Sequence, residues 1–396
     1  MKVRKTSLRH WSYLVRGGLN VALAIAVRRL SSRREPTVVF YGHTFNGNLK
    51  ALADYVRDQG EITCFFATID PLYCASLRAD PTATAAPLNL LRTRDVVRVA
   101  RSGAVVTDRE AQILEFLNRA SDLPFVDVWH GLPFKGFKSE SFKYLRHYCE
   151  VWVSSPTLRD IYRTKLGVSA DQLQVTGYPR TDRLVTGDFS AAAIRQKYGI
   201  GERHIRIVLV APTWRQDDKG RSIIPFGVTQ EQFFAAMDRL GKETGTLFIF
   251  RAHLNVHNAD RMPSMEHVVN MPYALYPDAE EFLAIADILV TDWSSMAFDY
   301  LPLRRPTIFL DVPPPFKDGF TLGPEHRFGD VVGSLDDYVR ALEMSLADPA
   351  AFEARHAEEI RATRDTLYGT TLDGKAAKRQ YARLRALVLG SGDLLR

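Results

Sequence analysis

Residues 288–300 read ILVTDWSSMAFDY, and this stretch decides the fold. Its first four residues are apolar or β-branched and predict a buried strand. A turn dense in hydroxyl groups follows, and a helix begins directly after that turn. Parallel strands need a crossover connection, usually a helix, so a strand that passes straight into a helix predicts a parallel α/β sheet.

The same alternation extends through the chain in both directions. One series of short β-branched or aromatic runs begins after Pro36, and a second begins after the turn at 199–201. Their spacing leaves room for a helix between strands, which predicts two Rossmann-like, doubly wound parallel-sheet domains facing a cleft. The predicted strands are 37–41, 61–66, 104–106, 125–129, 151–154 and 174–176, then 206–210, 246–250, 267–270, 288–291 and 307–310.

A chain of 396 residues is too long for one hydrophobic core, so at least two domains are expected. The boundary between the two series is predicted near 187–202. From 335 to about 389 the sequence predicts helix only. The expected parts are an N-terminal helix at 1–35, Rossmann-like domains at 36–200 and 201–345, and C-terminal helices at 346–396.

The composition favours a partner that carries phosphate. The net charge is +6, which suits a nucleotide, an anionic lipid or a nucleic acid and does not choose among them. The arginines are scattered and no strand interleaves aromatic with basic residues, so nucleic-acid binding is not expected. The three cysteines lack CxxC spacing, which argues against a disulfide framework or a structural zinc site.

The N-terminus carries a short apolar stretch at 19–27, with aromatic residues before it and arginines on both sides. It is too short to cross a bilayer, which takes about 20 apolar residues, and arginines stand where a signal peptide would be cleaved. An interfacial helix that lies on the membrane surface fits this pattern. The alternative is a helix packed on the protein's own core.

In parallel sheets ligands bind beyond the carboxyl ends of the strands, so the residues that follow each strand are candidates. His130 follows the strand at 125–129 and is followed by Gly131. Histidine titrates near neutral pH and can take a proton from an attacking hydroxyl. Lys135 is a candidate phosphate contact. The alternative for His130 is a hydrogen-bonded loop histidine.

The second series of strands ends in residues suited to phosphate. Arginine side chains and the N–H groups at a helix start both bind phosphate oxygens. Asp292 or Ser294 has the alternative role of a helix cap, and Asp311 that of a turn residue. The candidates are Thr213, Arg215, Arg251, His253, Thr291, Asp292, Ser294, Ser295, Arg305 and Asp311.

Several short motifs, in order, resemble one family, the CDP-glycerol glycerophosphotransferases of teichoic-acid and capsule synthesis. They are WHGLP at 129–133, GYPRTD at 177–182, APTWR at 211–215, RAH at 251–253, TDWSS at 291–295, FDY at 298–300 and RP at 305–306. Any one of them is a weak signal, whereas the ordered set is specific.

The resemblance implies a GT-B-like fold, with the acceptor on the domain at 36–200 and the nucleotide donor on the domain at 201–345. It implies transfer of glycerol phosphate or ribitol phosphate from CDP-glycerol or CDP-ribitol, with release of CMP, to a lipid-linked or polyol-phosphate acceptor. His130 matches the family's proposed base and His253 its second essential histidine. Thr291, Ser294 and Ser295 match the pyrophosphate-binding helix start, and Arg215 and Arg305 match further phosphate contacts. Gly131, Lys135 and Arg180 are expected on the acceptor side.

Family members are monotopic, so the resemblance also implies a peripheral enzyme on the cytoplasmic face of the cell membrane. No metal site or cofactor is expected, and weak stimulation by Mg²⁺ is compatible with the pattern. Trp293 stands where the family often has tyrosine, and the proline-rich stretch at 312–319 departs from the family pattern. The sequence leaves open the polyol, the acceptor, single addition or polymerisation, and the oligomeric state.

Two alternatives remain at this point. A GT-B glycosyltransferase or epimerase that uses a UDP-sugar would share the fold and the diphosphate site. A membrane-bound module that binds phosphorylated glycans without catalysis would keep the fold and lack turnover.

Overall fold

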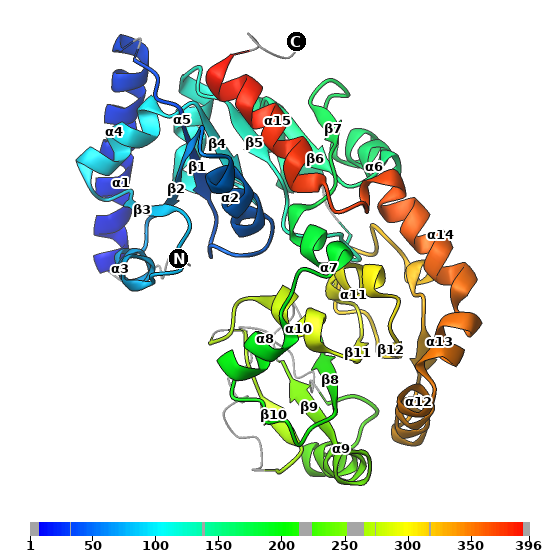
Figure 1. Ribbon diagram of the computed structural model, residues 1–396. Helices are drawn as coiled ribbons and strands as arrows, with labels where there is room; N and C mark the ends of the chain where they lie inside the picture. Colours follow the sequence, from blue (N-terminus) through cyan, green and yellow to red (C-terminus); the bar gives the residue numbers. More distant parts are fainter. Residues whose placement is uncertain are drawn as a thin grey trace. The chain divides into compact units, whose positions relative to one another are not determined.

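The computed structural model describes residues 8–31, 33–136, 139–213, 224–251, 265–273, 275–316 and 318–390. The chain forms two units, and their elements are labelled in Figure 1. Unit 1 contains residues 1–130, 138–182 and 371–396, and unit 2 contains residues 131–137 and 183–370. Both units are parallel α/β structures, which confirms the predicted fold class.

Unit 1 is built on a seven-stranded parallel sheet in the order β3-β2-β1-β4-β5-β6-β7. Tyr41 of β1 pairs with Thr107 of β4, and Thr107 pairs with Asp127 of β5, so these three strands end at the same edge. The strands are β1 (Thr37–Tyr41), β2 (Thr63–Thr68), β3 (Ala86–Asn89), β4 (Ala104–Thr107), β5 (Phe125–Asp127), β6 (Glu150–Val153) and β7 (Leu173–Val175). The α-helices of unit 1 are α1 (Leu8–Leu30), α2 (Gly47–Gln59), α3 (Pro71–Ala79), α4 (Thr93–Arg101), α5 (Glu115–Ala120), α6 (Pro156–Leu166) and α15 (Ala376–Leu389).

The last helix of the chain, α15, covers the sheet of unit 1. Its Tyr381 and Leu384 join the core formed by α2 and the first strands, and Val388 packs against the same cluster. Gly103, just before β4, allows this approach, because a Cβ there would lie 2.7 Å from Cγ1 of Val388. The N-terminal unit is therefore completed by a helix from the end of the chain.

Unit 2 is built on a six-stranded parallel sheet in the order β10-β9-β8-β11-β12-β13. The strands are β8 (Arg206–Ala211), β9 (Thr246–Phe250), β10 (Val268–Asn270), β11 (Ile288–Thr291), β12 (Thr307–Leu310) and β13 (Asp330–Val332). Its α-helices are α8 (Ala191–Lys197), α9 (Gln230–Thr244), α10 (Ala279–Ile285), α11 (Met296–Tyr300), α12 (Leu335–Ala347), α13 (Pro349–Arg355) and α14 (Ala357–Leu367), and the short α7 (Asp182–Thr186) begins at the boundary of the units.

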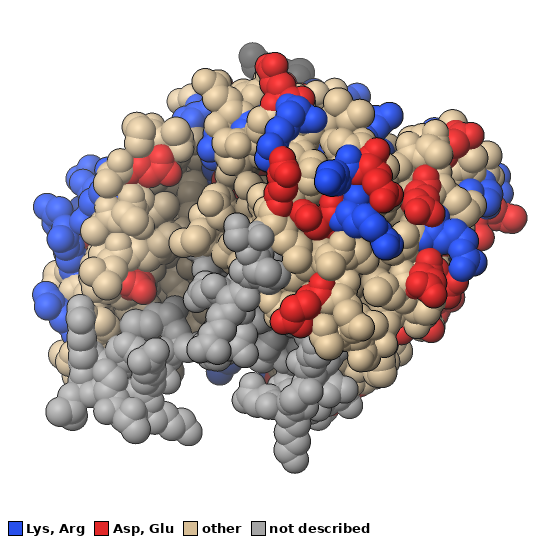
Figure 2. Space-filling view, turned by 90° about the horizontal axis from the view of Figure 1, so that it is seen from below, with Lys and Arg blue, Asp and Glu red and all other residues tan. Residues whose placement is uncertain are grey.

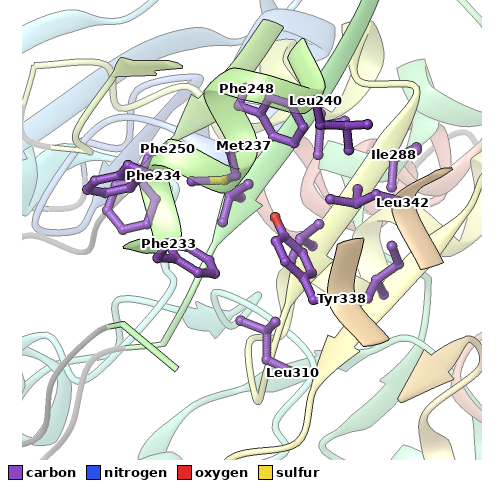
Figure 3. Packing of buried hydrophobic residues seen from close by; sticks show 14 of the residues in the cluster. Phe233, Phe234, Met237, Leu240, Phe248, Phe250, Ile288, Leu310, Tyr338 and Leu342 are labelled. Atoms are coloured by element: carbon purple, nitrogen blue, oxygen red, sulfur yellow. The ribbon is translucent and has the colours of Figure 1, made fainter. Parts of the chain in front are cut away.

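Helices α9 and α12 cover one face of this sheet. Phe233 and Met237 of α9 and Tyr338 and Leu342 of α12 meet strand residues such as Ile288 in one buried cluster (Figure 3). Burying each of these large apolar side chains contributes about 1.5–3 kcal/mol. Helix α9 begins with a capping box, in which Thr229 and Gln232 satisfy each other's backbone N–H groups.

The observed units differ from the predicted ranges in four places. The units divide after residue 182, so residues 183–200, predicted in the N-terminal domain, belong to unit 2. The predicted C-terminal part at 346–396 is divided, because α13 and α14 pack in unit 2 and α15 packs in unit 1. The N-terminal helix at 1–35 belongs to unit 1, and residues 131–137 belong to unit 2. The edge strands β3 and β13 were not predicted. Strand β3 contains Pro87, which an edge strand tolerates because one side of it has no partner.

Candidate functional site

His130 stands just beyond the end of β5, on a turn whose backbone is unusual. Trp129 has a φ of 49°, in the left-handed region that large side chains rarely adopt. Two hydrogen bonds hold this conformation: Trp129 N donates to Oδ1 of Asp127 at 3.0 Å, and Nδ2 of Asn48 donates to Trp129 O at 2.8 Å. Backbone strain that is held by surrounding contacts is often found at functional sites, where it orients a side chain.

The imidazole of His130 has one nitrogen engaged. Its Nδ1 lies 2.9 Å from the backbone O of Asp108, and because a carbonyl can only accept, Nδ1 carries the proton. Nε2 is then the unprotonated nitrogen. The side chain keeps solvent-accessible surface, yet desolvation by the surrounding protein and, next, the charge of Arg109 lower the pKa of His130 to about 4. In the neutral imidazole the unprotonated Nε2 is available as a proton acceptor at neutral pH.

Arg180 lies next to His130, and its predicted role on the acceptor side stays a prediction. Its Nη1 donates to His130 O at 2.5 Å, and its backbone N donates to Oδ1 of Asn48 at 3.2 Å. Asn48 is buried on the first turn of α2 and therefore ties the loop of His130 to the loop of Arg180. Sequence reasoning missed Asn48, because its partners lie 81 and 132 positions further along the chain.

Gly131 and Lys135 follow His130 in sequence but belong to unit 2. Lys135 forms an antiparallel bridge with Phe320, and Gly136 N donates to Gly319 O at 2.7 Å. A Cβ on Gly136 would lie 2.0 Å from the O of Asp318, so only glycine allows this approach. The segment that carries Lys135 is therefore fixed by the backbone of unit 2.

In unit 2, Asp292 links the ends of β8 and β11. Its Oδ1 accepts from Thr213 N at 2.8 Å and from Trp293 N at 2.6 Å, and it also accepts a short hydrogen bond from the Thr213 hydroxyl. Thr291 donates its hydroxyl to Ala211 O at 2.8 Å. Both Asp292 and Thr291 are buried. These contacts give them a structural role, which differs from the predicted phosphate contact, since a carboxylate repels phosphate and the Thr291 hydroxyl is engaged.

Ser294 and Ser295 stand at the start of α11 and remain partly accessible. Oγ of Ser294 accepts from Met296 N at 3.3 Å, while Ser295 makes no side-chain cap. Helix α11 has only five residues before a 3-10 turn at Leu301–Leu303. A helix this short contributes only a weak dipole. A phosphate at this turn would be bound mainly by hydrogen bonds from the two serine hydroxyls and the nearby backbone N–H groups.

The three predicted phosphate-binding arginines have different surroundings. Nη1 of Arg305 donates to Ala284 O at 2.9 Å and to Ala286 O at 2.7 Å, so this side chain closes the end of α10. Arg251 is buried beneath Phe282, with Nη1 donating to Met271 O, and Nε and Nη2 make no hydrogen bond within the described residues. Burial lowers the pKa of Arg251. Arg215 and His253 lie outside the described residues.

Asp311 follows β12, and its side chain is largely exposed. It pairs with Nη1 of Arg327 at 3.3 Å, and the guanidinium of Arg327 stacks on Trp293 at 3.7 Å from the ring centre. Nε1 of Trp293 donates to Val312 O at 2.8 Å. Asp311 therefore holds an arginine that supports the turn at 291–295, and the prediction had missed that arginine.

Comparison with known proteins decides the family. Residues 23–385 match the model of the family described as CDP-Glycerol:Poly(glycerophosphate) glycerophosphotransferase. The chain belongs to this family. The resemblance noted in the sequence motifs is thus confirmed.

Over the residues that align, relatives of this glycerophosphotransferase-family chain are about a quarter identical to it. The teichoic acid poly(ribitol-phosphate) polymerase of Bacillus spizizenii is 28% identical over 228 residues, which cover 53% of this chain and 35% of that protein. The teichoic acid glycerol-phosphate primase of Bacillus subtilis is 26% identical over 239 residues, covering 56% of this chain and 58% of that protein. The chain thus matches between about a third and three fifths of the length of these relatives.

Solved structures share the fold. The wall teichoic acid polymerase TagF superposes with a TM-score of 0.75 at 17% identity, covering 97% of this chain and 99% of that chain. A putative UDP-N-acetylglucosamine 2-epimerase from Listeria monocytogenes gives a TM-score of 0.53 at 13% identity, covering 89% of this chain and 96% of that chain. The GT-B-like prediction agrees with these likenesses.

Two further residues of this family member lie beside His130 and were also missed. Arg109 follows β4, and its Nε binds Oδ1 of Asp108 at 2.9 Å. His43 follows β1, the strand next to β4. Both positions satisfy the rule that singled out His130, since each lies two residues beyond the end of its strand. Reading the ends of every predicted strand would have found them.

Proposed function

We propose that this chain transfers a polyol phosphate from a CDP-linked donor to an acceptor hydroxyl and releases CMP. The donor is CDP-glycerol or the related CDP-ribitol, since the relatives carry glycerol phosphate or ribitol phosphate in their names. One solved structure of TagF includes a soak with CDPG. The observation that carries the proposal is the geometry of His130, whose Nδ1 is held by the backbone O of Asp108 and whose Nε2 is left to accept a proton, in a chain of this family.

In the proposed reaction Nε2 of His130 removes the proton from the acceptor hydroxyl. The oxygen forms a bond to the phosphorus that bears the polyol, and the bond from that phosphorus to the bridging oxygen of the diphosphate breaks. CMP leaves with the bonding electrons, and His130 returns its proton to solvent. Phosphoryl transfer depends mainly on positioning and on charge stabilisation, which arginine and hydroxyl groups supply.

On the donor side we assign the phosphates to Ser294, Ser295 and Arg251. The two serines offer accessible hydroxyls, and Arg251 retains two nitrogens that make no hydrogen bond within the described residues. By resemblance, His253 and Arg215 join this group. Arg305 supports the group indirectly, by fixing the end of α10. We expect the reaction to need no tightly bound metal.

We further propose that the partner surface is the cytoplasmic face of a membrane, reached through α1. One face of this helix packs on unit 1: Nδ2 of Asn20 donates to Leu90 O at 3.0 Å, and Nη1 of the buried Arg28 donates to Ser102 O at 2.7 Å. The opposite face carries exposed apolar side chains spaced about one turn apart. They include Trp11, Val15, Leu19, Leu23 and Leu30, of which Leu19 is 69% exposed.

The two interpretations of the N-terminal helix, an interfacial helix and a helix packed on the protein's own core, are therefore compatible. One face of α1 packs on unit 1, and the other presents an apolar stripe. Figure 2 shows Lys and Arg side chains gathered at the edge of unit 1 that carries α1 and α4. An apolar stripe beside basic residues suits the boundary between acyl chains and anionic headgroups. No helix in the described part of the chain is long and apolar enough to span a bilayer.

The deciding experiment measures CMP release from the purified chain. CDP-glycerol and CDP-ribitol are each supplied with and without a lipid-linked or short polyol-phosphate acceptor. Release that requires the acceptor supports the proposal, and the preferred donor identifies the polyol. If the folded protein releases CMP from neither donor and instead turns over a UDP-sugar, the glycosyltransferase or epimerase alternative replaces it. Donor binding without any turnover would indicate the non-catalytic module.

A further inference from the structure

Three neighbouring strands of unit 1 end in residues that carry imidazole or guanidinium groups. Tyr41 of β1 pairs with Thr107 of β4, and Thr107 pairs with Asp127 of β5. Adjacent strands lie about 4.8 Å apart, so His43, Arg109 and His130 leave the sheet at the same edge within a few strand spacings. Only His130 has a role in the reaction proposed above.

Asp108 joins the members of this cluster. Its backbone O binds Nδ1 of His130 at 2.9 Å, and its carboxylate binds Nε of Arg109 at 2.9 Å. Gly42 lies against the same carboxylate, since a Cβ at that position would stand 2.9 Å from Oδ1 of Asp108. The backbone that presents His43 is therefore packed directly on the residue that orients His130.

The state of His43 differs from that of a structural histidine. Its side chain is exposed, and neither ring nitrogen makes a hydrogen bond within the described part of the chain. Desolvation, and next the charge of Arg109, lower the pKa of His43 to about 4, and the nearby His130 acts in the same direction. A neutral imidazole offers one donor and one acceptor, which suits an alcohol and gives no charge attraction for a phosphate.

We propose that His43 binds a hydroxyl of the acceptor's terminal polyol, the one next to the hydroxyl that His130 deprotonates. This inference rests on the proposed polyol-phosphate transfer and adds the residue that recognises the acceptor. A polyol end carries neighbouring hydroxyl groups, so two imidazoles at one sheet edge can address two of them at once. The contact holds the reacting oxygen in line with Nε2 of His130 and discriminates a polyol from a simple alcohol.

The test compares two acceptors on four proteins. One acceptor ends in glycerol phosphate. The other ends in a propanediol phosphate, which keeps the primary hydroxyl and lacks its neighbour. The proteins are the full chain, His43→Ala and His43→Gln, with His147→Gln as the matched control, because His147 is another exposed histidine of unit 1. The KM for each acceptor, the KM for CDP-glycerol and the thermal midpoint are measured for each.

We expect the glycerol-terminated acceptor to bind the unaltered protein about 10-fold more tightly than the propanediol acceptor, the size of effect expected for one hydrogen bond. His43→Ala should remove this difference, raising the KM of the glycerol acceptor about 10-fold with the KM of CDP-glycerol unchanged. His147→Gln should retain the difference. If the His43 variants keep the preference, or lose activity equally on both acceptors, the inference is wrong. If the unaltered protein releases no CMP with any acceptor, the proposed function itself has failed.

Discussion

Replacing Asn48 with alanine tests whether the turn that carries His130 is held in place by its hydrogen bonds. The buried amide donates to Trp129 O at 2.8 Å and accepts from Arg180 N at 3.2 Å. The variant removes a donor from one backbone group and an acceptor from another. Each loss costs about 1–3 kcal/mol where no replacement reaches the group, so we expect the free energy of unfolding to fall by about 2–4 kcal/mol.

Activity should fall by more than this loss of stability explains. Without the amide, the left-handed backbone of Trp129, which stores about 1–3 kcal/mol, is free to relax, and relaxation turns His130 away. A displacement of about 1 Å at a reacting group can cost about 100-fold in rate. We therefore expect kcat to drop by about that factor at a temperature where the variant is fully folded.

The matched control is Asn20→Ala. Asn20 is also a buried asparagine of unit 1 that donates to a backbone oxygen, that of Leu90 at 3.0 Å, and it makes no contact with His130. Urea unfolding gives the stability of each variant, and CMP release gives kcat. If Asn48→Ala and Asn20→Ala lose stability and kcat to the same extent, Asn48 has no positioning role and the reasoning is refuted.

Five further outcomes are expected. His130→Ala should lower kcat by about 10²–10⁴-fold with an unchanged thermal midpoint, and near-normal turnover would remove its role as base. The pKa of His130 is lowered to about 4, so kcat/KM should hold down to about pH 5 and fall below it, whereas a midpoint near the ordinary histidine value would contradict the assignment. For the same group the folded state resists protonation, so its contribution to stability is complete above the unfolded pKa of about 6.5 and is lost as pH falls toward 4, which urea titrations at several pH values can follow. Leu19→Glu should abolish co-sedimentation with anionic vesicles without changing CMP release from a soluble acceptor, and retained sedimentation would exclude the stripe on α1. Treatment with EDTA should leave most of the activity, and a complete loss restored by one metal would show that a metal site exists.

The sheets were predictable because their strands are continuous apolar runs, as at 206–210 and 288–291. The edge strand β3 was not, since Pro87 lowers its strand propensity and only the neighbouring β2 explains it. Helix α15 could be predicted as a helix but not placed. Its packing on unit 1 depends on contacts such as Gly103 with Val388, which no local pattern reveals.

In the candidate site, too, the features that depend on local sequence were predictable and those that depend on long-range contacts were not. His130 and Arg180 could be named as candidates from the sequence, because residues that follow strands or lie in motifs are recognised from local information alone. The role of Asp292 could not be predicted, because its partner Thr213 lies 79 residues earlier in the chain and turns an apparent ligand into a structural link. The contacts of Arg305 were equally unpredictable, since its carbonyl acceptors lie at the end of another helix, and its phosphate role stays a prediction.

The position of α15 has a consequence for how the protein is made. Residues 376–389 are synthesised after all the described strands of both sheets, yet Tyr381 and Leu384 cover the core of unit 1. Part of the apolar surface of the unit 1 sheet therefore stays uncovered until unit 2 has been synthesised. Apolar surface that stays exposed during folding is prone to aggregation. A chain that stops before residue 376 would carry every described strand of both sheets. It would still lack the helix that covers the core of unit 1.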